Sequence, residues 1–190
     1  MRSYRLFFLS MIALAAFTGC EKEGNKKFDA VVDSIAGEYK VSSIYRDDGV
    51  SMDLNGDGVA HDNLLEEFDA MPGLDYSLAY SSVYKSYYEG DGNELIKLHF
   101  PVQLYGEEYD SITLHLDMAL ITAYYTVGDD FTVEVGKIFG GNPGYMPTEK
   151  GIWFDTFGNI KIEVFCTLSE DEGKTVEVVP VTYTFSKFAG

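Results

Sequence analysis

The stretch Ile160-Lys161-Ile162-Glu163-Val164-Phe165-Cys166 decides the fold class of this chain. Apolar side chains occupy its even-numbered positions, and Lys161 and Glu163 lie between them. Successive side chains of a strand point to opposite faces of a sheet, so this period of two predicts a strand with one face in the core. Cys166 lies on the apolar face, which predicts a buried, unreactive thiol rather than a nucleophile.

Similar alternation extends along the chain in both directions. It covers residues 38–46, 76–88, 94–105, 110–126, 131–138, 151–155 and 175–188. Clusters of Gly, Asp and Glu at 89–93 and 106–108 predict hairpin turns between neighbouring strands. Residues 138–150 are rich in Gly and Pro without periodicity, so we expect a loop there. About eight strands predict an all-β, mainly antiparallel domain, either a small barrel or a sandwich.

One short helix is predicted before the first strand. Phe28, Val31, Val32 and Ile35 follow the spacing i, i+3, i+4, i+7, and Gly37 follows as a helix stop. The expected domain is therefore a β barrel or sandwich with a short N-terminal helix.

The first 19 residues have the three zones of an export signal. Arg2 and Arg5 precede an apolar run over residues 6–17, and small residues follow it. This run, about 12 residues, is shorter than the ~20 that a membrane-spanning helix needs. Residues 17–20, Phe-Thr-Gly-Cys, resemble the bacterial lipobox, which is cut before its cysteine. The resemblance implies that lipid is attached to Cys20; an ordinary signal peptide with a chance cysteine is the alternative.

These patterns divide the chain into three segments. Residues 1–19 are expected to be removed as a lipoprotein signal peptide, residues 20–27 to form a lipid-anchored polar spacer, and residues 28–190 to form one domain. Without Arg2 and Arg5, 12 of the 14 basic side chains remain against 31 acidic ones, a net charge of −19. Such a surface repels nucleic acid and anionic lipid, so no nucleic-acid partner is expected.

The acidic segment Asp53-Leu-Asn-Gly-Asp-Gly-Val59 is the sharpest motif. Oxygens at positions 1, 3 and 5 of a tight loop, with glycine at 6 and a carbonyl at 7, can surround Ca²⁺. Position 12, where an EF-hand has glutamate, is Leu64, so the EF-hand match fails at its end. The candidate metal ligands are Asp53, Asn55, Asp57, Val59, Asp62, Glu66 and Glu67.

A plain polar turn is the alternative to a calcium loop. Asn, Asp and Gly tolerate left-handed backbone conformations, and Asp62 or Asn63 would then cap a short helix that begins at Leu64. A bound ion would serve to stabilise the loop, because no reaction centre lies beside it in the sequence.

Tyrosines form a stripe along the predicted strand at 76–88. Tyr76, Tyr80, Tyr84 and Tyr88 share one face, where rings with hydroxyl tips suit a sugar or a flat apolar ligand. Packing in the core is the alternative, because aromatic residues on one strand face are more often buried.

Two histidines face each other if the strands at 94–105 and 110–126 turn at Gly106. In that register the numbers of two paired residues always sum to 214. His99 then lies opposite His115, and Phe100 lies opposite Leu114. Two imidazoles do not complete a metal site, so exposed histidines on a polar sheet face are the expected state.

Catalytic signatures are missing from the sequence. It contains no Gly-x-Ser-x-Gly elbow, His-Glu-x-x-His pair or phosphate-binding loop, and no spacing singles out a pair of carboxylates. We therefore expect a protein that is not an enzyme.

A family resemblance rests on three parts of the chain. Gly37-Glu38-Tyr39 after a short helix resembles the opening of a lipocalin, with Tyr39 at the place of the family's tryptophan. With the lipobox and the acidic loop followed by Asn63-Leu-Leu-Glu-Glu67, the chain resembles lipocalin-like lipoproteins of Bacteroides-type bacteria, whose functions are mostly unknown. The resemblance implies a lipocalin-like barrel that is lipid-anchored in the bacterial envelope, at the outer membrane, with the periplasmic face or the cell surface left open.

The leading functional hypothesis is a non-enzymatic, lipid-anchored barrel that binds a small apolar or sugar ligand, or an envelope protein. An eight-stranded barrel can enclose one small ligand. A cavity lined by the tyrosine stripe would favour binding, whereas an interior filled by side chains would favour a structural or assembly lipoprotein. A hydrolase of glycans or lipids is the third alternative and would need converging polar groups.

Overall fold

The computed structural model describes residues 27–71, 80–85, 94–108, 111–140 and 145–188. One antiparallel sheet forms most of this described part. Its eight strands are β1 (Gly37–Arg46), β2 (Ser81–Tyr84), β3 (Glu94–Glu108), β4 (Ser111–Val127), β5 (Val133–Gly140), β6 (Tyr145–Phe154), β7 (Ile160–Leu168) and β8 (Glu177–Lys187). The predicted signal peptide, Cys20 and most of the spacer lie outside the described residues.

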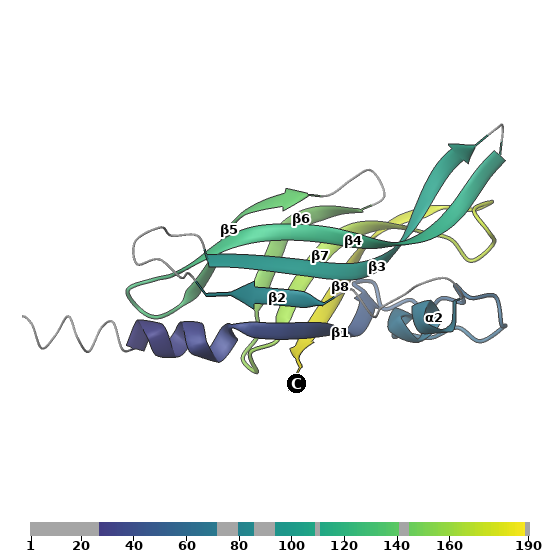
Figure 1. Ribbon diagram of the computed structural model, residues 1–190. Coiled ribbons are helices and arrows are strands. Elements are labelled where there is room, and N and C mark those ends of the chain that lie inside the picture. The colour runs from purple at the N-terminus through teal and green to yellow at the C-terminus, as the bar shows by residue number, and fades with distance from the viewer. Residues whose placement is uncertain (1–26, 72–79, 86–93, 109–110, 141–144, 189–190) are drawn as a thin grey trace, which may run out of the picture.

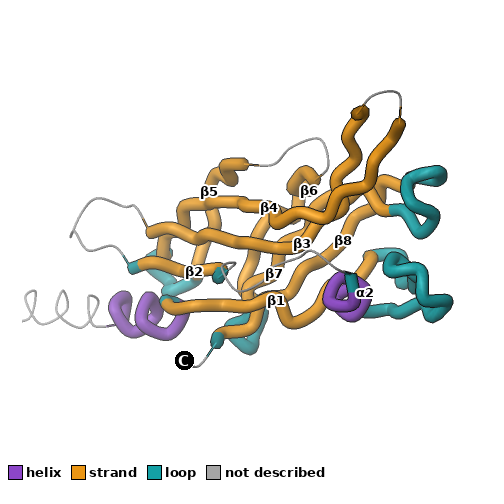
Figure 2. Tube along the Cα trace, turned by 45° about the vertical axis from the view of Figure 1, so that its right-hand side comes forward, coloured by secondary structure: helices purple, strands orange, loops and turns teal. Residues whose placement is uncertain are grey.

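The sheet curls into a nearly closed barrel (Figure 1). The strand order is β5-β4-β3-β2-β1-β8-β7-β6, and the edge strands β5 and β6 come close to one another. The prediction of an all-β, lipocalin-like fold is confirmed, and the architecture is a barrel rather than a sandwich. Figure 2 shows the loops gathered at the ends of this barrel.

Two short helices lie at opposite ends of β1 (Figure 1). Residues 27–35 are helical, which confirms the predicted N-terminal helix. Helix α2 (Leu64–Ala70) begins after Asn63, whose Oδ1 accepts hydrogen bonds from Leu65 N (3.3 Å) and from Ile44 N (2.8 Å). The same side chain therefore caps α2 and attaches it to β1.

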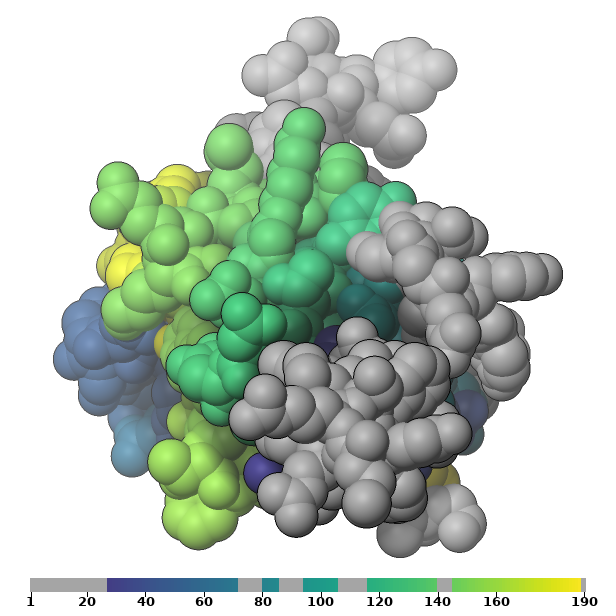
Figure 3. Space-filling view, turned by 90° about the vertical axis from the view of Figure 1, so that its left-hand side faces the viewer, coloured from purple at the N-terminus to yellow at the C-terminus, as the bar shows by residue number. Residues whose placement is uncertain are grey.

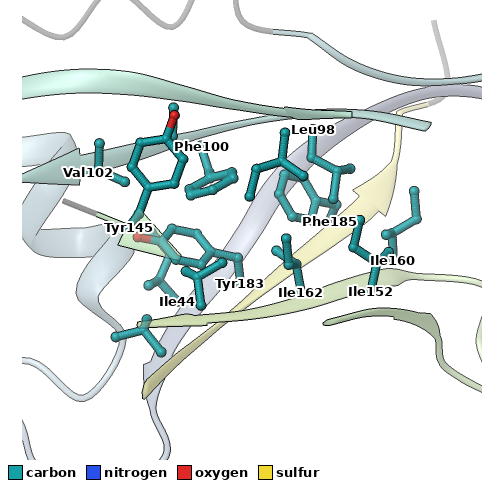
Figure 4. Packing of buried hydrophobic residues seen from close by; sticks show 14 of the residues in the cluster. Ile44, Leu98, Phe100, Val102, Tyr145, Ile152, Ile160, Ile162, Tyr183 and Phe185 are labelled. Carbon is teal, nitrogen blue, oxygen red and sulfur yellow. The ribbon is translucent and has the colours of Figure 1, made fainter. Parts of the chain in front are cut away.

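Large side chains fill the interior of the barrel (Figure 4). Phe100, Tyr183 and Phe185 have no exposed surface, and the ring centroids of Phe100 and Tyr183 lie 4.6 Å apart. Buried tyrosine hydroxyls find backbone partners: Tyr183 donates to Pro101 O (2.9 Å) and Tyr39 to Ile35 O (2.6 Å). Burial raises the pKa of Tyr39 to about 12, so its hydroxyl stays neutral. The described core is that of a packed barrel.

Cys166 lies inside this core. It is 1% exposed, its Sγ is 3.4 Å from Tyr183 Oη, and burial raises the pKa of its thiol to about 12. A thiol with so high a pKa is not ionised at neutral pH and is a poor nucleophile. The prediction of a buried, unreactive cysteine is confirmed.

The predicted pairing of β3 with β4 is wrong. Phe100 pairs with Ala119 and not Leu114, and His99 pairs with Leu120, whereas His115 lies opposite Leu104. Gly106 is not the turn; it sits inside β3, which continues to Glu108. The two histidines therefore do not face each other.

The register error also reverses the faces of β4. The true pairing differs from the predicted one by an odd number of residues, and such a shift moves every side chain to the other side of the sheet. Ala119, Ile121 and Ala123 point into the core, whereas Leu120 is 41% exposed on the outside.

The predicted loop at 138–150 is wrong at both ends, because β5 continues to Gly140 and β6 begins at Tyr145. Tyr145 pairs with Cys166 and Pro147 with Val164, and after a register shift Ile152 pairs with Ile162. Pro147 is tolerated because β6 is an edge strand, and the irregular register hides the period of two. Residues 141–144 lie outside the described residues.

Candidate functional site

Two acidic loops meet at the end of the barrel that carries α2 (Figures 1 and 2). One follows β1 (residues 47–63) and the other connects β7 with β8 (residues 169–176). Asp53 N donates a 2.8 Å hydrogen bond to Glu170 Oε1, which joins the two loops. We refer to residues 47–63 and 169–177 together as the acidic end.

Side-chain oxygens of the first loop bind the loop's own backbone. The Asp53 carboxylate accepts hydrogen bonds from the N–H groups of Gly56 (2.8 Å), Asp57 (3.1 Å) and Gly58 (2.8 Å). Asn55 Oδ1 accepts from Asp57 N, and Asp57 Oδ1 accepts from Val59 N, both at 2.8 Å. Gly56 and Gly58 have φ values of +75° and +90°, the left-handed region that the predicted turn requires. This pattern is a network of Asx turns.

Glu67 of α2 holds the loop from inside. Its side chain is fully buried, and Oε2 accepts hydrogen bonds from Leu54 N (2.8 Å) and Asn55 N (3.0 Å). Its other oxygen contacts His61 Nδ1. A buried carboxylate is tolerated when hydrogen bonds and a charged or polar partner compensate for lost water. Glu67 has two such hydrogen bonds and His61 as its partner.

The structure brings only part of the predicted metal-ligand set together. Glu67 does return to the loop, but its carboxylate accepts hydrogen bonds from backbone N–H groups. Asp62 accepts a hydrogen bond from Ser51 Oγ, and Glu66 Oε2 lies 3.6 Å from His61 Nε2. Within the described residues, no three His, Cys, Asp or Glu side chains are placed to hold a metal ion. The polar-turn interpretation accounts for the observed geometry, and Ca²⁺ binding stays a prediction.

The contact between His61 and Glu67 predicts a pH-dependent contribution to stability. The hydrogen bond that His61 donates to the Glu67 carboxylate is the main cause that raises the pKa of His61 above its ordinary value of about 6.5. Protonated His61 therefore stabilises the fold fully below pH ~6.5, and this contribution is lost as the pH rises through the raised pKa. In urea unfolding, His61→Gln should destabilise the protein more at pH 6 than at pH 9. An equal loss at both values would contradict this prediction.

A cavity of about 180 Å³ opens between the two acidic loops. Its apolar wall consists of Met52 and Leu168, which are 4% and 1% exposed. The remaining lining residues are polar or acidic: Ser169, Glu170, Asp171, Thr175 and Glu177. Three carboxylates therefore surround a small apolar surface.

Hydrogen bonds and an ion pair hold these carboxylates in place. Asp171 accepts bonds from Thr175 N (2.7 Å), Thr175 Oγ1 (2.7 Å) and Ser169 Oγ (2.8 Å), and its pKa is lowered to about 2, chiefly by the Thr175 backbone N–H. Glu177 Oε2 lies 3.1 Å from Arg46 Nη1, and Arg46 also binds Asp48. The cavity is thus surrounded by fixed negative charge.

The barrel core supports the second loop through Gln103 of β3. Gln103 Oε1 accepts a hydrogen bond from Ser169 N (2.8 Å), and Gln103 Nε2 donates to Ser169 O (3.3 Å). Gln103 is 1% exposed, so the start of the loop is attached to a rigid strand. Sequence reasoning missed this cavity, because its residues come from β7, β8 and two loops. The turn signal Ser-Glu-Asp-Glu-Gly at 169–173 was the available clue.

The two described tyrosines of the stripe, Tyr80 and Tyr84, lie on the outside of the barrel. Tyr80 and Tyr84 are 38% and 45% exposed, whereas Ser81 and Val83 point inward and are buried. Packing in the core, the alternative raised by the sequence, is wrong for Tyr80 and Tyr84, and these two tyrosines do not line the barrel interior. Tyr76 and Tyr88 lie outside the described residues, and ligand contact through the stripe stays a prediction.

Comparison with known proteins identifies no relative. No family model, curated protein or solved structure matches the chain. The resemblance to lipocalin-like lipoproteins therefore stays a prediction, and functional proposals rest on the site itself. In the part of the chain that the structure describes, no helix is long and apolar enough to cross a membrane.

Proposed function

We propose that this protein is a lipid-anchored, non-enzymatic binding protein of the bacterial envelope that receives a positively charged side chain or small amine at its acidic end. One observation carries the proposal: the described core side chains are buried against one another, and the cavity found among the described residues lies outside that core, between carboxylates held in place. This favours binding at the surface over the enclosed ligand of the initial hypothesis.

The shape and chemistry of the cavity match a lysine or arginine side chain. Its volume of about 180 Å³ is below the ~300–1,000 Å³ of typical small-molecule sites, so it suits a single side chain. The methylene stem would lie against Met52 and Leu168, and the cationic head would face Glu170, Asp171 and Glu177. A partner protein with an exposed basic segment, or a small amine, fits this description.

The location of the cavity suits an anchored protein. The anchor on Cys20 precedes the helix at 27–35, which lies at one end of β1, and the acidic end lies at the other. The ten residues of β1 at ~3.3 Å each separate these ends by about 33 Å. The cavity would therefore be held away from the point of attachment.

A structural or assembly role is the second candidate, and the packed interior favours it. The two candidates differ at the acidic end, because a purely structural protein needs no cavity there. A catalytic role receives no support from the cavity, since each of its carboxylates is held by a hydrogen bond or an ion pair.

The proposal predicts weak, charge-dependent binding of a lysine analogue beside Met52. In a Cys20→Ser chain with labelled methionine methyls, N-acetyl-lysine methylamide should shift the Met52 signal and saturate near the millimolar range, as expected for a few solvent-exposed ion pairs. Glu170→Gln should weaken this binding about two- to fivefold.

Two controls separate recognition from general charge. Glu172→Gln removes the same charge from the same loop without touching the cavity and should leave binding nearly unchanged. N-acetyl-norleucine methylamide has the stem without the ammonium group and should not bind. A Met52 signal that ignores the lysine analogue, or responds equally to norleucine, would reject the proposal.

A further inference from the structure

Exposed aromatic and apolar side chains gather on the outer face of β2, β4 and β5. They are Tyr80, Tyr84, Leu120, Tyr124 and Phe139, each between 38% and 45% exposed. Cross-strand pairing makes them neighbours: Leu95 of β3 lies between Tyr84 and Tyr124, and the rings of Tyr124 and Phe139 are 5.3 Å apart. Figure 1 shows that β2, β3, β4 and β5 lie side by side.

Lysines are interleaved with these rings. Lys40 Nζ lies 5.2 Å from the Tyr80 ring, Lys137 Nζ lies 5.3 Å from the Phe139 ring, and Lys97 lies between Ser82 and Thr122. We call this surface, with its five apolar residues and three lysines, the tyrosine–lysine face.

The strands of the tyrosine–lysine face carry two carboxylates against its three lysines, and the turn at its edge adds Asp129 and Asp130 beside Lys27. Glu38 pairs with Ser82, and Glu134 pairs with Thr126. Three lysines against two glutamates contrast with the whole chain, whose formal charge is −17. The face differs in charge from the acidic end, which begins about 23 Å from Lys40 along β1, at ~3.3 Å per residue.

The predicted anchor enters the domain beside this face. Lys27 Nζ lies 5.7 Å from the ring of Phe131, in the turn between β4 and β5, so the described chain begins at the edge of the face. Figure 3 looks at the barrel from this end, with the β4 and β5 segment in green on the surface. Cys20 precedes Lys27 by seven residues, which span at most about 25 Å. A membrane that holds the lipid on Cys20 is therefore within that distance of the start of the helix.

We propose that the tyrosine–lysine face lies against the headgroup region of an anionic bilayer, which makes this face a second, non-covalent membrane contact. The inference rests on the proposed lipid anchor. Tyrosine suits a membrane interface because its ring is apolar and its hydroxyl polar, and lysine ammonium groups are attracted to anionic headgroups.

The acidic remainder of the protein does not prevent this contact. At physiological salt, charges are screened over ~8 Å, far less than the length of β1. The anchor also keeps the face at a high effective concentration near the bilayer, so a weak attraction suffices. In this orientation the cavity at the acidic end stays open to solution.

Tryptophan quenching by lipid tests the inference. Trp153→Phe removes the chain's single tryptophan, and Tyr124→Trp then reports on the tyrosine–lysine face. Phe165→Trp in the same background is a matched reference, because Phe165 is 45% exposed, close to the 40% of Tyr124, and lies on β7, on the other side of the barrel. The full acylated chain is reconstituted into phosphatidylethanolamine–phosphatidylglycerol vesicles with and without bromine near the headgroup end of the acyl chains.

We expect bromine to quench the tryptophan of Tyr124→Trp at least threefold more than that of Phe165→Trp. Combined Lys40→Glu, Lys97→Glu and Lys137→Glu should abolish the difference, whereas Lys161→Glu on β7 should preserve it. Circular dichroism melting checks that all variants fold.

Other outcomes overturn the inference in distinguishable ways. A chain that does not float with the vesicles refutes the anchor and, with it, the membrane contact. A chain that floats while both positions are quenched equally, or neither is, leaves the anchor intact and refutes the contact. Absence of quenching in vesicles together with a blue-shifted Tyr124→Trp emission in native envelopes would assign the face to a protein partner instead.

Discussion

Replacing Cys20 with serine is expected to move the protein completely from the membrane fraction to the soluble fraction. Lipid is attached to the cysteine sulfur in a lipobox, so a serine hydroxyl removes the acceptor. Each buried methylene of an acyl chain contributes ~0.8 kcal/mol, and several chains on one residue give stable attachment. The measurement is fractionation of cells together with incorporation of labelled palmitate.

Cys166→Ser is the matched control for this experiment. Cys166 is buried in the barrel, so its replacement should leave both lipid incorporation and membrane attachment unchanged. Retention of label and membrane association by Cys20→Ser would show that residues 17–20 are not a functional lipobox.

Phe100→Ala is expected to lower the free energy of unfolding by about 3–5 kcal/mol. The ring is fully buried and contacts Tyr183 (4.6 Å between centroids), Tyr145 (5.6 Å) and Phe185 (6.4 Å). Its removal loses apolar burial and leaves a cavity that these rigid neighbours on β6 and β8 cannot fill. Urea unfolding of the Cys20→Ser chain measures the change.

Phe157 provides the comparison for the core variant. It is 88% exposed, so Phe157→Ala should alter stability by no more than about 0.5 kcal/mol. A loss at Phe100 as small as that at Phe157 would mean that the barrel interior is loose or hollow, and the argument for surface binding would lose its basis.

Strand content could be predicted from the sequence because alternation is a local property. Ile160, Ile162 and Val164 are all fully buried on one face of β7, as their spacing indicated, and Cys166 joins them. The helix cap at Asn63 followed from equally local chemistry.

Which face of a strand points into the core could not be predicted where both faces carry apolar side chains. In β4 the outward Met118 and Leu120 are larger than the inward Ala119 and Ala123, so apolar size pointed to the wrong face. The small inward residues fit because large rings from other strands already occupy the interior. The tyrosine stripe was misplaced for the same reason, since small Ser81 and Val83 take the inward positions of β2.

The cavity at the acidic end depends on contacts between distant segments. Met52 and Glu170 are more than a hundred residues apart, and the hydrogen bond from Asp53 N to Glu170 Oε1 brings their loops together. Local patterns contain no information on such a contact. They identified the first acidic loop, as a candidate metal site or a polar turn, but gave no sign that it forms one wall of a cavity.

The central claim is that binding occurs at the acidic end and not inside the barrel. A methyl spectrum of the Cys20→Ser chain, labelled at Ile, Leu and Met, compares both places directly: Leu98 and Ile162 report on the packed interior, and Met52 reports on the cavity. Titration with N-acetyl-lysine methylamide should shift Met52 alone, and titration with laurate, an apolar ligand of the kind a hollow barrel would enclose, should shift neither Leu98 nor Ile162. Saturable movement of Leu98 and Ile162 by laurate, with Met52 unaffected by the lysine analogue, would contradict the claim.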